Sequence, residues 1–115
     1  MKSVKNGILN LIGKSFWEEV SEKNTLVMFY LENCGFCRVF QFDYEKIGEE
    51  SGGIKVARFD YGKNEAYGLE KVEEFPSIAL FTNGKPIFYK GKLDKDSILE
   101  FVQENSIKDT NRIEL

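Results

Sequence analysis

The sequence predicts an α/β domain with a central mixed sheet and helices on both of its faces. Three observations support this prediction. Apolar runs of strand length alternate with segments whose apolar residues recur at three- and four-residue steps. One run, residues 25–31, is apolar almost throughout, which is typical of a strand that is buried on both faces. Asn83-Gly84 is a strong hairpin signal, so at least part of the sheet is expected to be antiparallel.

The expected elements follow the order β-α-β-α-β-α-β-β-α, after a polar opening at residues 1–6 that is expected to be loose. The expected strands, in chain order, are residues 8–12, 25–31, 54–59, 77–82 and 86–89. The expected helices begin at Ser15 and Phe36, with a short one near residues 65–71 and a last one over 94–104. Pro86 at the start of its strand favours an edge position, because proline lacks the N–H group that a sheet ladder needs.

Local signals mark the ends of the first two helices. Ser15 is followed three residues later by Glu18, which is a capping-box pattern, so the first helix is expected to start there. The apolar residues of the second helix recur at helical spacing: Phe36, Val39, Phe40, Tyr44 and Ile47. Ser51-Gly52-Gly53 then ends this helix near Glu50.

The composition limits the kind of function. A chain of 115 residues, 42% hydrophobic and 30% charged, fits one domain over residues 1–115, with a core at 8–105 and a polar tail at 106–115. Lysine and arginine total 16 against 19 acids, a net charge of −3, which argues against a nucleic-acid partner. No run approaches the roughly 18 apolar residues of a membrane span, so no membrane association is expected. The chain has no histidine, which excludes Ser-His and Cys-His catalysis.

The only two cysteines form one motif, Cys34-Gly35-Phe36-Cys37, between the buried strand and the second helix. Cys34 falls at the helix N-terminus, where unpaired N–H groups and the positive end of the helix dipole favour a thiolate. Cys37 lies one turn further in, where it is more shielded and close enough to bond back to Cys34. We therefore predict Cys34 as the nucleophile and Cys37 as its resolving partner. Gly35 is expected to keep the turn unhindered, and Phe36 to form an apolar cap beside the dithiol.

Two other uses of the cysteine pair remain open. A zinc site would need its remaining ligands from carboxylates or from another subunit, because the chain has no other cysteine and no histidine. A structural disulfide would add little stability, because a loop of two intervening residues removes little chain entropy. A Cys-x-x-Cys between a strand and a helix is typical of a redox pair, so we expect no metal and no cofactor.

These residues resemble a known family. The strand, the Cys34–Cys37 motif and the helix, followed by Phe75-Pro76-Ser77-Ile78 and then Asn83-Gly84, resemble the thioredoxin superfamily. The likeness is closer to the catalytic, a-type domains of protein disulfide isomerases and covers residues 4–105. Further counterparts in order and spacing are residues 13–16, 27–30, 56–60 and 74–77. The resemblance implies a thioredoxin fold.

The resemblance also implies a thiol–disulfide oxidoreductase or isomerase acting on protein disulfides. Its partners would be protein substrates with thiols or disulfides and a redox partner such as glutathione, an oxidase or a reductase. Pro76 would be in cis beside the dithiol, with the backbone of Phe75 offering hydrogen bonds to an extended substrate. An ordinary trans proline in a turn is the alternative. Lys92 falls where the family has an arginine that lowers the pKa of the second cysteine, and a solvated surface lysine is the alternative there.

Two departures from the family concern proton transfer and charge. Met28 occupies the position of a buried carboxylate that helps to move the proton of the second cysteine, and Arg58 matches the usual basic partner of that acid. Resolution through Cys37 is therefore expected to be slow. Phe36 stands where strongly oxidising isomerases have histidine, so the helix end alone lowers the pKa of Cys34. We expect a reduction potential between about −270 and −180 mV.

Two further departures lie beside the motif. Asn33 replaces a tryptophan, and Phe42 replaces a proline that kinks the helix. A flatter, more polar rim and a straighter helix are expected.

The end of the sequence bears on location. Arg112-Ile113-Glu114-Leu115 shares its last two residues with the Lys-Asp-Glu-Leu retention signal of the endoplasmic reticulum. The expected location is therefore the lumen of that organelle, as a monomer or as one module of a longer protein. If these residues are only a frayed polar tail, a cytoplasmic disulfide reductant of the thioredoxin type is the alternative. A peptide-binding chaperone module with a weakly active dithiol is a second alternative, because Phe36 and the Phe75-Pro76 edge suit peptide binding.

Overall fold

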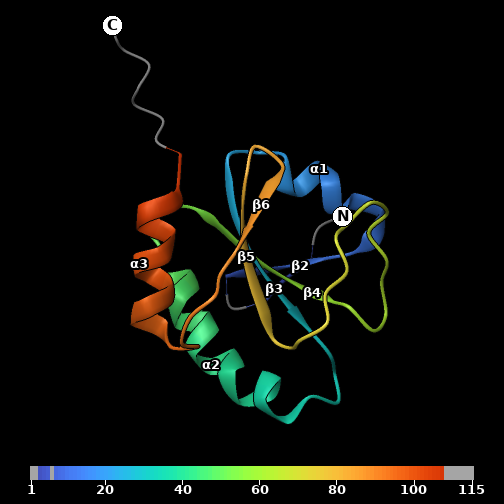
Figure 1. Ribbon diagram of the computed structural model, residues 1–115, viewed down its shortest axis with the longest axis horizontal. Helices are drawn as coiled ribbons and strands as arrows, with labels where there is room; N and C mark the ends of the chain where they lie inside the picture. Colours follow the sequence, from blue (N-terminus) through green and yellow to red (C-terminus); the bar gives the residue numbers. More distant parts are fainter. Residues whose placement is uncertain (1–2, 6, 108–115) are drawn as a thin grey trace, which may run out of the picture.

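The computed structural model describes residues 3–5 and 7–107 (Figure 1). The strands are β1 (Ser3–Lys5), β2 (Ile8–Leu11), β3 (Asn24–Tyr30), β4 (Lys55–Asp60), β5 (Ser77–Thr82) and β6 (Lys85–Phe88). The helices are η1, a short 3-10 helix (Gly13–Ser15), α1 (Phe16–Val20), α2 (Gly35–Glu50) and α3 (Lys95–Asn105). The strands form one mixed sheet of six in the order β1-β2-β4-β3-β5-β6.

The sheet places β3 at its centre. β3 pairs in parallel with β4 and antiparallel with β5, and β2 pairs in parallel with β4. The carboxyl ends of β2, β4 and β3 therefore lie at the same edge, and at this edge the chain leaves β3 for the cysteine motif. β6 pairs with β5 alone and forms an edge of the sheet, as Pro86 predicts.

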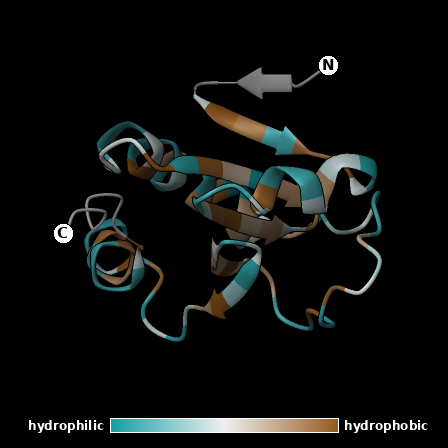
Figure 2. Ribbon diagram, turned by 90° about the horizontal axis from the view of Figure 1, so that it is seen from above, coloured by the Kyte–Doolittle hydropathy of each residue, from teal (hydrophilic) through white to brown (hydrophobic). Residues whose placement is uncertain are grey.

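Two apolar cores form because successive residues of a strand face opposite sides of a sheet. Leu26 and Met28 of β3 belong to the core beneath α2 and α3, whereas Val27 and Phe29 belong to the core that includes Phe16 of α1. Figure 2 shows the hydrophobic colour concentrated on the strands between the helices. The predicted α/β architecture, with helices on both faces of a mixed sheet, is confirmed.

The expectation that residues 1–6 are loose is wrong for residues 3–5, which form β1. Ser3 pairs with Asn10 and Lys5 with Ile8, antiparallel to β2. Gly7 turns the chain between the two strands with φ +79°, which glycine adopts readily. A strand at a sheet edge needs only its backbone groups to pair, so a polar sequence gives little warning of it.

No helix forms near residues 65–71, and that expectation is wrong. Residues 61–76 instead connect β4 to β5 without a helix or strand. Gly68 has φ +86°, which breaks a helix, and the indole N–H of Trp17 donates to the carbonyl of Tyr67 at 2.7 Å. A side chain of α1 thus takes a backbone acceptor that a helix would have used internally.

The capping box at Ser15 is not formed. The Ser15 side chain makes no capping hydrogen bond, and its backbone (φ −110°, ψ 6°) lacks the extended conformation of an N-cap. The reason is that η1 precedes α1, so the Ser15 N–H already donates to Ile12 at 3.2 Å. The other expected elements begin and end within one residue of the observed ones.

The two remaining expectations concern a membrane span and the last residues of the chain. None of the helices in the described ranges is long and apolar enough to cross a membrane. The retention-like residues 112–115, and the tail from 108 onward, lie outside the described residues.

Candidate functional site

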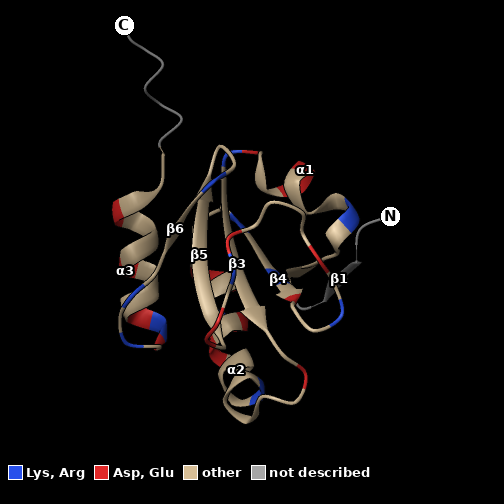
Figure 3. Ribbon diagram, turned by 45° about the vertical axis from the view of Figure 1, so that its right-hand side comes forward, with Lys and Arg blue, Asp and Glu red and all other residues tan. Residues whose placement is uncertain are grey.

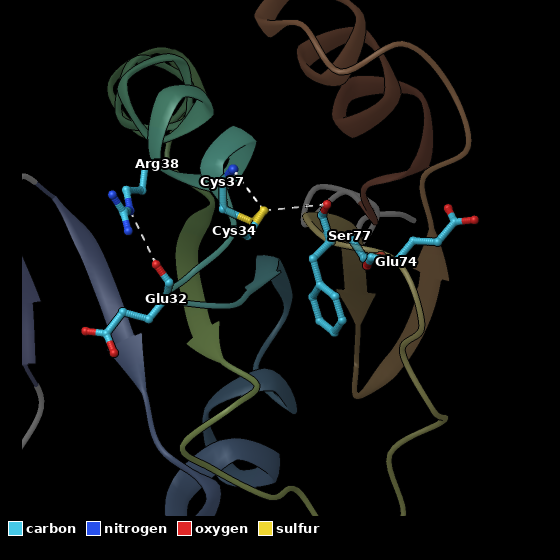
Figure 4. The surroundings of a disulfide bond; sticks show 7 residues. Glu32, Cys34, Cys37, Arg38, Glu74 and Ser77 are labelled. Atoms are coloured by element: carbon cyan, nitrogen blue, oxygen red, sulfur yellow. Dashed lines mark hydrogen bonds between the residues drawn. A yellow bond between two sulfur atoms is a disulfide. The ribbon is translucent and has the colours of Figure 1, made fainter.

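Cys34 and Cys37 are joined by a disulfide at the amino end of α2, with their Cα atoms 5.2 Å apart (Figure 4). Cys34 is the N-cap of α2, in extended conformation, and its sulfur accepts the N–H of Cys37 at 3.1 Å. This is the helix N-terminal placement that the sequence predicts. When the disulfide is reduced, the same N–H group and the positive end of the helix favour a thiolate on Cys34.

The two cysteines differ in accessibility. Cys34 is half-buried, whereas Cys37 is only 3% exposed. Cys34 is therefore the more accessible residue of the pair.

The chain before β5 packs against this disulfide. The carbonyl oxygen of Phe75 lies 3.8 Å from Sγ of Cys34, although the two residues are 41 positions apart. The Phe75-Pro76 peptide bond is cis, as the resemblance implies, and the Phe75 ring contacts Tyr61 with centroids 5.3 Å apart. A groove of about 640 Å³ adjoins Pro76 and runs between residues 70–78 and 88–93.

The two residues between the cysteines are exposed. Phe36 is 50% exposed, and its ring stacks on Phe40 with centroids 6.0 Å apart. The interpretation of Gly35 needs correction. A β-carbon at Gly35 would meet no atom within 4 Å, so the turn does not require glycine there.

Acidic and basic residues both occur on α2 and on the segments around it (Figure 3). Arg38 Nε donates to the backbone carbonyl of Glu32 at 3.3 Å, which turns the guanidinium toward the loop before α2 (Figure 4). Lys63 forms an exposed ion pair with the Glu32 carboxylate at 3.2 Å, and this pairing raises the pKa of Lys63. In the described part of the chain, no group of three or more Cys, Asp or Glu residues is placed to hold a metal ion.

Comparison with known proteins settles the family. The family model described as Thioredoxin matches residues 7–104. The chain belongs to the thioredoxin family. The first thioredoxin domain of mouse Protein disulfide-isomerase A4 superposes with a TM-score of 0.84 at 27% identity, covering 100% of this chain and 89% of that one. This likeness confirms the thioredoxin fold.

Three similar curated proteins are named as protein disulfide-isomerases. Protein disulfide-isomerase of Saccharomyces cerevisiae is 28% identical over 109 residues, which cover 87% of this chain and 21% of that protein. Protein disulfide-isomerase A4 of Bos taurus is 32% identical over 108 residues, with 89% and 17% covered. Protein disulfide-isomerase 5-1 of Arabidopsis thaliana is 29% identical over 119 residues, with 97% and 82% covered. The chain thus spans about a fifth of the length of the first two relatives.

Within this thioredoxin-family domain, Met28 and Arg58 lie on the sheet face beneath α2. Met28 is 1% exposed and belongs to the apolar core there. Arg58 Nε donates to Asn10 Oδ1 on β2, and its guanidinium carbon lies 6.0 Å from the ring centroid of Tyr30. Burial and the charge of Asp60 raise the pKa of Tyr30, while Arg58 opposes that shift.

The contacts of Arg58 with Asn10 and Tyr30 could not be predicted from the sequence. They depend on the strand order β2-β4-β3, which places Asn10 opposite Arg58 on one side and Tyr30 two positions beyond the β3 partner of Arg58 on the other. A single sequence carries no signal for that order.

Lys92 belongs to a later part of the chain, after β6. It is exposed in the loop between β6 and α3, and its carbonyl accepts the hydroxyl of Tyr89. Its charge acts on Asp94, whose pKa is lowered first by hydrogen bonds from Ser97 and then by Lys92. Among the described contacts, none joins the Lys92 side chain to either cysteine.

Proposed function

We propose that this domain is a thiol–disulfide oxidoreductase that acts on the disulfides of protein substrates. The observation that carries the proposal is the half-buried Cys34 sulfur, which caps α2, is bonded to the buried Cys37, and lies 3.8 Å from the Phe75 carbonyl. The similarity to proteins named as disulfide isomerases supports the same chemistry.

The proposed reaction uses the reduced dithiol. The Cys34 thiolate attacks one sulfur of a substrate disulfide, forms a bond with it, and releases the other substrate sulfur as a thiolate. Cys37 then loses its proton and attacks the Cys34 sulfur, which releases the first substrate sulfur as a thiolate. Two electrons pass to the substrate, and the domain is left with the Cys34–Cys37 disulfide. The reverse sequence oxidises a substrate dithiol.

Isomerisation follows the same first step. If another thiolate of the substrate attacks the mixed disulfide before Cys37 does, the substrate leaves with a rearranged disulfide and the domain stays reduced. The rate of attack by Cys37 therefore decides between reduction and isomerisation.

The backbone of Phe75 is the proposed contact for an extended substrate. It lies at the amino end of β5, next to Cys34, where a substrate segment can pair with it as an added strand. The groove beside Pro76 offers room for the chain that follows.

The proposed setting is the lumen of the endoplasmic reticulum, with glutathione or a dedicated oxidase or reductase as the redox partner. The support is the family of the relatives, which are named as protein disulfide-isomerases. A cytoplasmic reductant of the thioredoxin type would have a reduction potential near the lower end of the expected range, at about −270 mV.

The test combines two measurements on one sample: the reduction potential in glutathione buffers and the reactivation of scrambled ribonuclease. We expect a potential above about −270 mV and reactivation that Cys34→Ser abolishes. Cys37→Ser should accumulate a mixed disulfide between Cys34 and the substrate. Full reactivation by Cys34→Ser would instead favour a peptide-binding chaperone module. The exposed ring of Phe36 would suit peptide binding in such a module.

A further inference from the structure

Three exposed apolar side chains lie on the first two turns of α2, next to the disulfide. Phe36 is 50%, Val39 65% and Phe42 68% exposed. The described residues include seven large exposed hydrophobic ones, and three of the seven are in this short stretch. Single exposed apolar residues are ordinary on a protein surface, but a group of them marks an interaction site. We refer to Phe36, Val39 and Phe42 as the α2 stripe.

The α2 stripe is not part of the core that α2 forms with the sheet. The buried residues of the helix are Cys37, Phe40, Tyr44 and Ile47. Each three-residue step along the stripe turns by about 60° around the helix axis, so the stripe winds from Phe36 at the border of the buried face toward solvent at Phe42. At its start, the stacking of Phe36 on Phe40 holds the ring in place.

The α2 stripe begins inside the cysteine motif. Phe36 lies between the two cysteines in sequence, and the Phe75 carbonyl lies beside Cys34 from another segment of the chain. A polypeptide whose sulfur bonds to Cys34 therefore has a backbone edge to one side and the stripe within reach along α2. Arg38, a charged side chain four positions before Phe42, donates to the carbonyl of Glu32 in the loop before α2.

We propose that the α2 stripe binds an aromatic or branched aliphatic side chain of the substrate polypeptide, close in sequence to the substrate cysteine that Cys34 attacks. This proposal rests on the proposed function. From Phe36 to Phe42 the helix rises by about 9 Å, at roughly 1.5 Å per residue. An extended chain spans about 3.3 Å per residue, so a side chain two to four positions from the substrate cysteine reaches the stripe. Apolar residues near cysteines are mostly buried in folded proteins, so the preferred substrates are incompletely folded chains.

The test uses two short peptides that differ at one pair of positions. Each has a single cysteine, with phenylalanine three residues away on both sides in one peptide and serine in the other. The cysteine carries 5-thio-2-nitrobenzoate as a mixed disulfide, and the protein carries Cys37→Ser. When the Cys34 thiolate attacks the peptide sulfur, a peptide–Cys34 disulfide forms and the coloured thiolate leaves, so its absorbance gives the rate.

We expect the phenylalanine peptide to react about five- to tenfold faster than the serine peptide. The reason is that a phenylalanine ring packed on the stripe is removed from water, which stabilises the complex of peptide and protein before the sulfur is attacked. Adding Val39→Ser and Phe42→Ser should bring the ratio to about one. Ile107→Ser is the matched control, because Ile107 is 48% exposed and bonds to Asn24, at the opposite end of β3 from the motif. This control should keep the full ratio.

Nuclear magnetic resonance of the trapped complex supplies a second readout. Resonances of Val39 and Phe42 should shift with the phenylalanine peptide and stay in place with the serine peptide. Equal rates for the two peptides, or a ratio that Val39→Ser and Phe42→Ser leave unchanged, would overturn the inference while the exchange chemistry stands.

Two other outcomes also count against the α2 stripe as a substrate contact. If neither peptide reacts faster than it does with free N-acetylcysteine, the proposed function itself fails. If sedimentation shows a dimer that Val39→Ser and Phe42→Ser dissociate, a second copy of the chain covers the stripe instead.

Discussion

Met28 and Arg58 are register partners on the parallel strands β3 and β4, on the sheet face that α2 covers. The side chain next to the guanidinium on β3 is thus an apolar thioether. Arg58 bonds instead to Asn10 on β2 and lies near the ring of Tyr30. This arrangement provides no carboxylate at position 28 to take the proton of Cys37, which the second step of the proposed reaction must remove.

Met28→Glu is therefore expected to accelerate resolution of the mixed disulfide. A positioned base contributes about 10²–10⁴-fold in favourable cases, and we expect at least about tenfold here. Burial raises the pKa of such a carboxyl group, so the gain should grow as pH rises and the group ionises. Quenched-flow measurement of Cys37 attack on a trapped mixed disulfide, from pH 6 to 9, checks this.

Met28→Gln is the control for that measurement, because it adds a polar group of similar size without a titratable proton. If the glutamate and glutamine variants resolve the mixed disulfide at the same rate across the pH range, position 28 has no role in proton transfer.

The parts of the structure that local chemistry decides could be predicted from the sequence. The cysteine motif lies at a helix N-terminus because a buried strand ends before it and helical spacing begins after it. The hairpin at Asn83-Gly84 forms with positive φ at both residues, 52° and 85°, as that pair of residue types favours. The buried central strand follows from an apolar run too continuous for a surface position.

Other parts depend on contacts between distant segments. β1 pairs through its backbone, so Ser3–Lys5 shows no apolar pattern that would reveal it. Residues 65–71 lack a helix because Gly68 and the bond from Trp17 to Tyr67 favour another path. Sequence spacing gives no information on such partners.

Lys55 should stabilise the fold in a pH-dependent way. Its ammonium contacts the nearly buried Glu19 carboxylate at 2.8 Å and Glu22 at 2.7 Å. Burial lowers the pKa of Lys55, but the hydrogen bonds that its ammonium donates to the Glu19 and Glu22 carboxylates outweigh this effect and raise the pKa above 10.5. A raised pKa in the folded state means that the stabilisation is full below pH 10.5 and is lost as pH rises through the folded value.

Lys55→Met is accordingly expected to lower the free energy of unfolding by about 1–2 kcal/mol at pH 7, because the nearly buried Glu19 carboxylate loses the ammonium of Lys55. Urea denaturation of both proteins at pH 7, 9 and 11 measures the difference. It should be constant from pH 7 to 9 and smaller at pH 11. A difference that grows at pH 11 would contradict the assigned role of the ammonium.

Tyr44 ties α2 to the sheet through its hydroxyl group. The oxygen lies 3.1 Å from the carbonyl of Leu26 and 2.6 Å from that of Ala57, in a site where the tyrosine is 1% exposed. Tyr44→Phe should cost about 1–2 kcal/mol of unfolding free energy, since buried carbonyl groups lose a donor. Urea denaturation checks this, with Tyr89→Phe as the control at an exposed hydroxyl. Equal costs for the two variants would show that burial adds nothing at Tyr44.

Phe36→His should make the Cys34–Cys37 disulfide more oxidising. Phe36 is half exposed between the cysteines, so an imidazolium there can stabilise the Cys34 thiolate and with it the reduced form. Relative to Phe36→Gln, which is polar but uncharged, we expect a potential higher by about 30 mV at pH 7, which is tenfold in the equilibrium with glutathione. The two variants should converge at pH 9, because histidine with a usual pKa of about 6.5 is neutral there. Equal potentials at pH 7 would mean that the helix end alone controls the Cys34 thiolate.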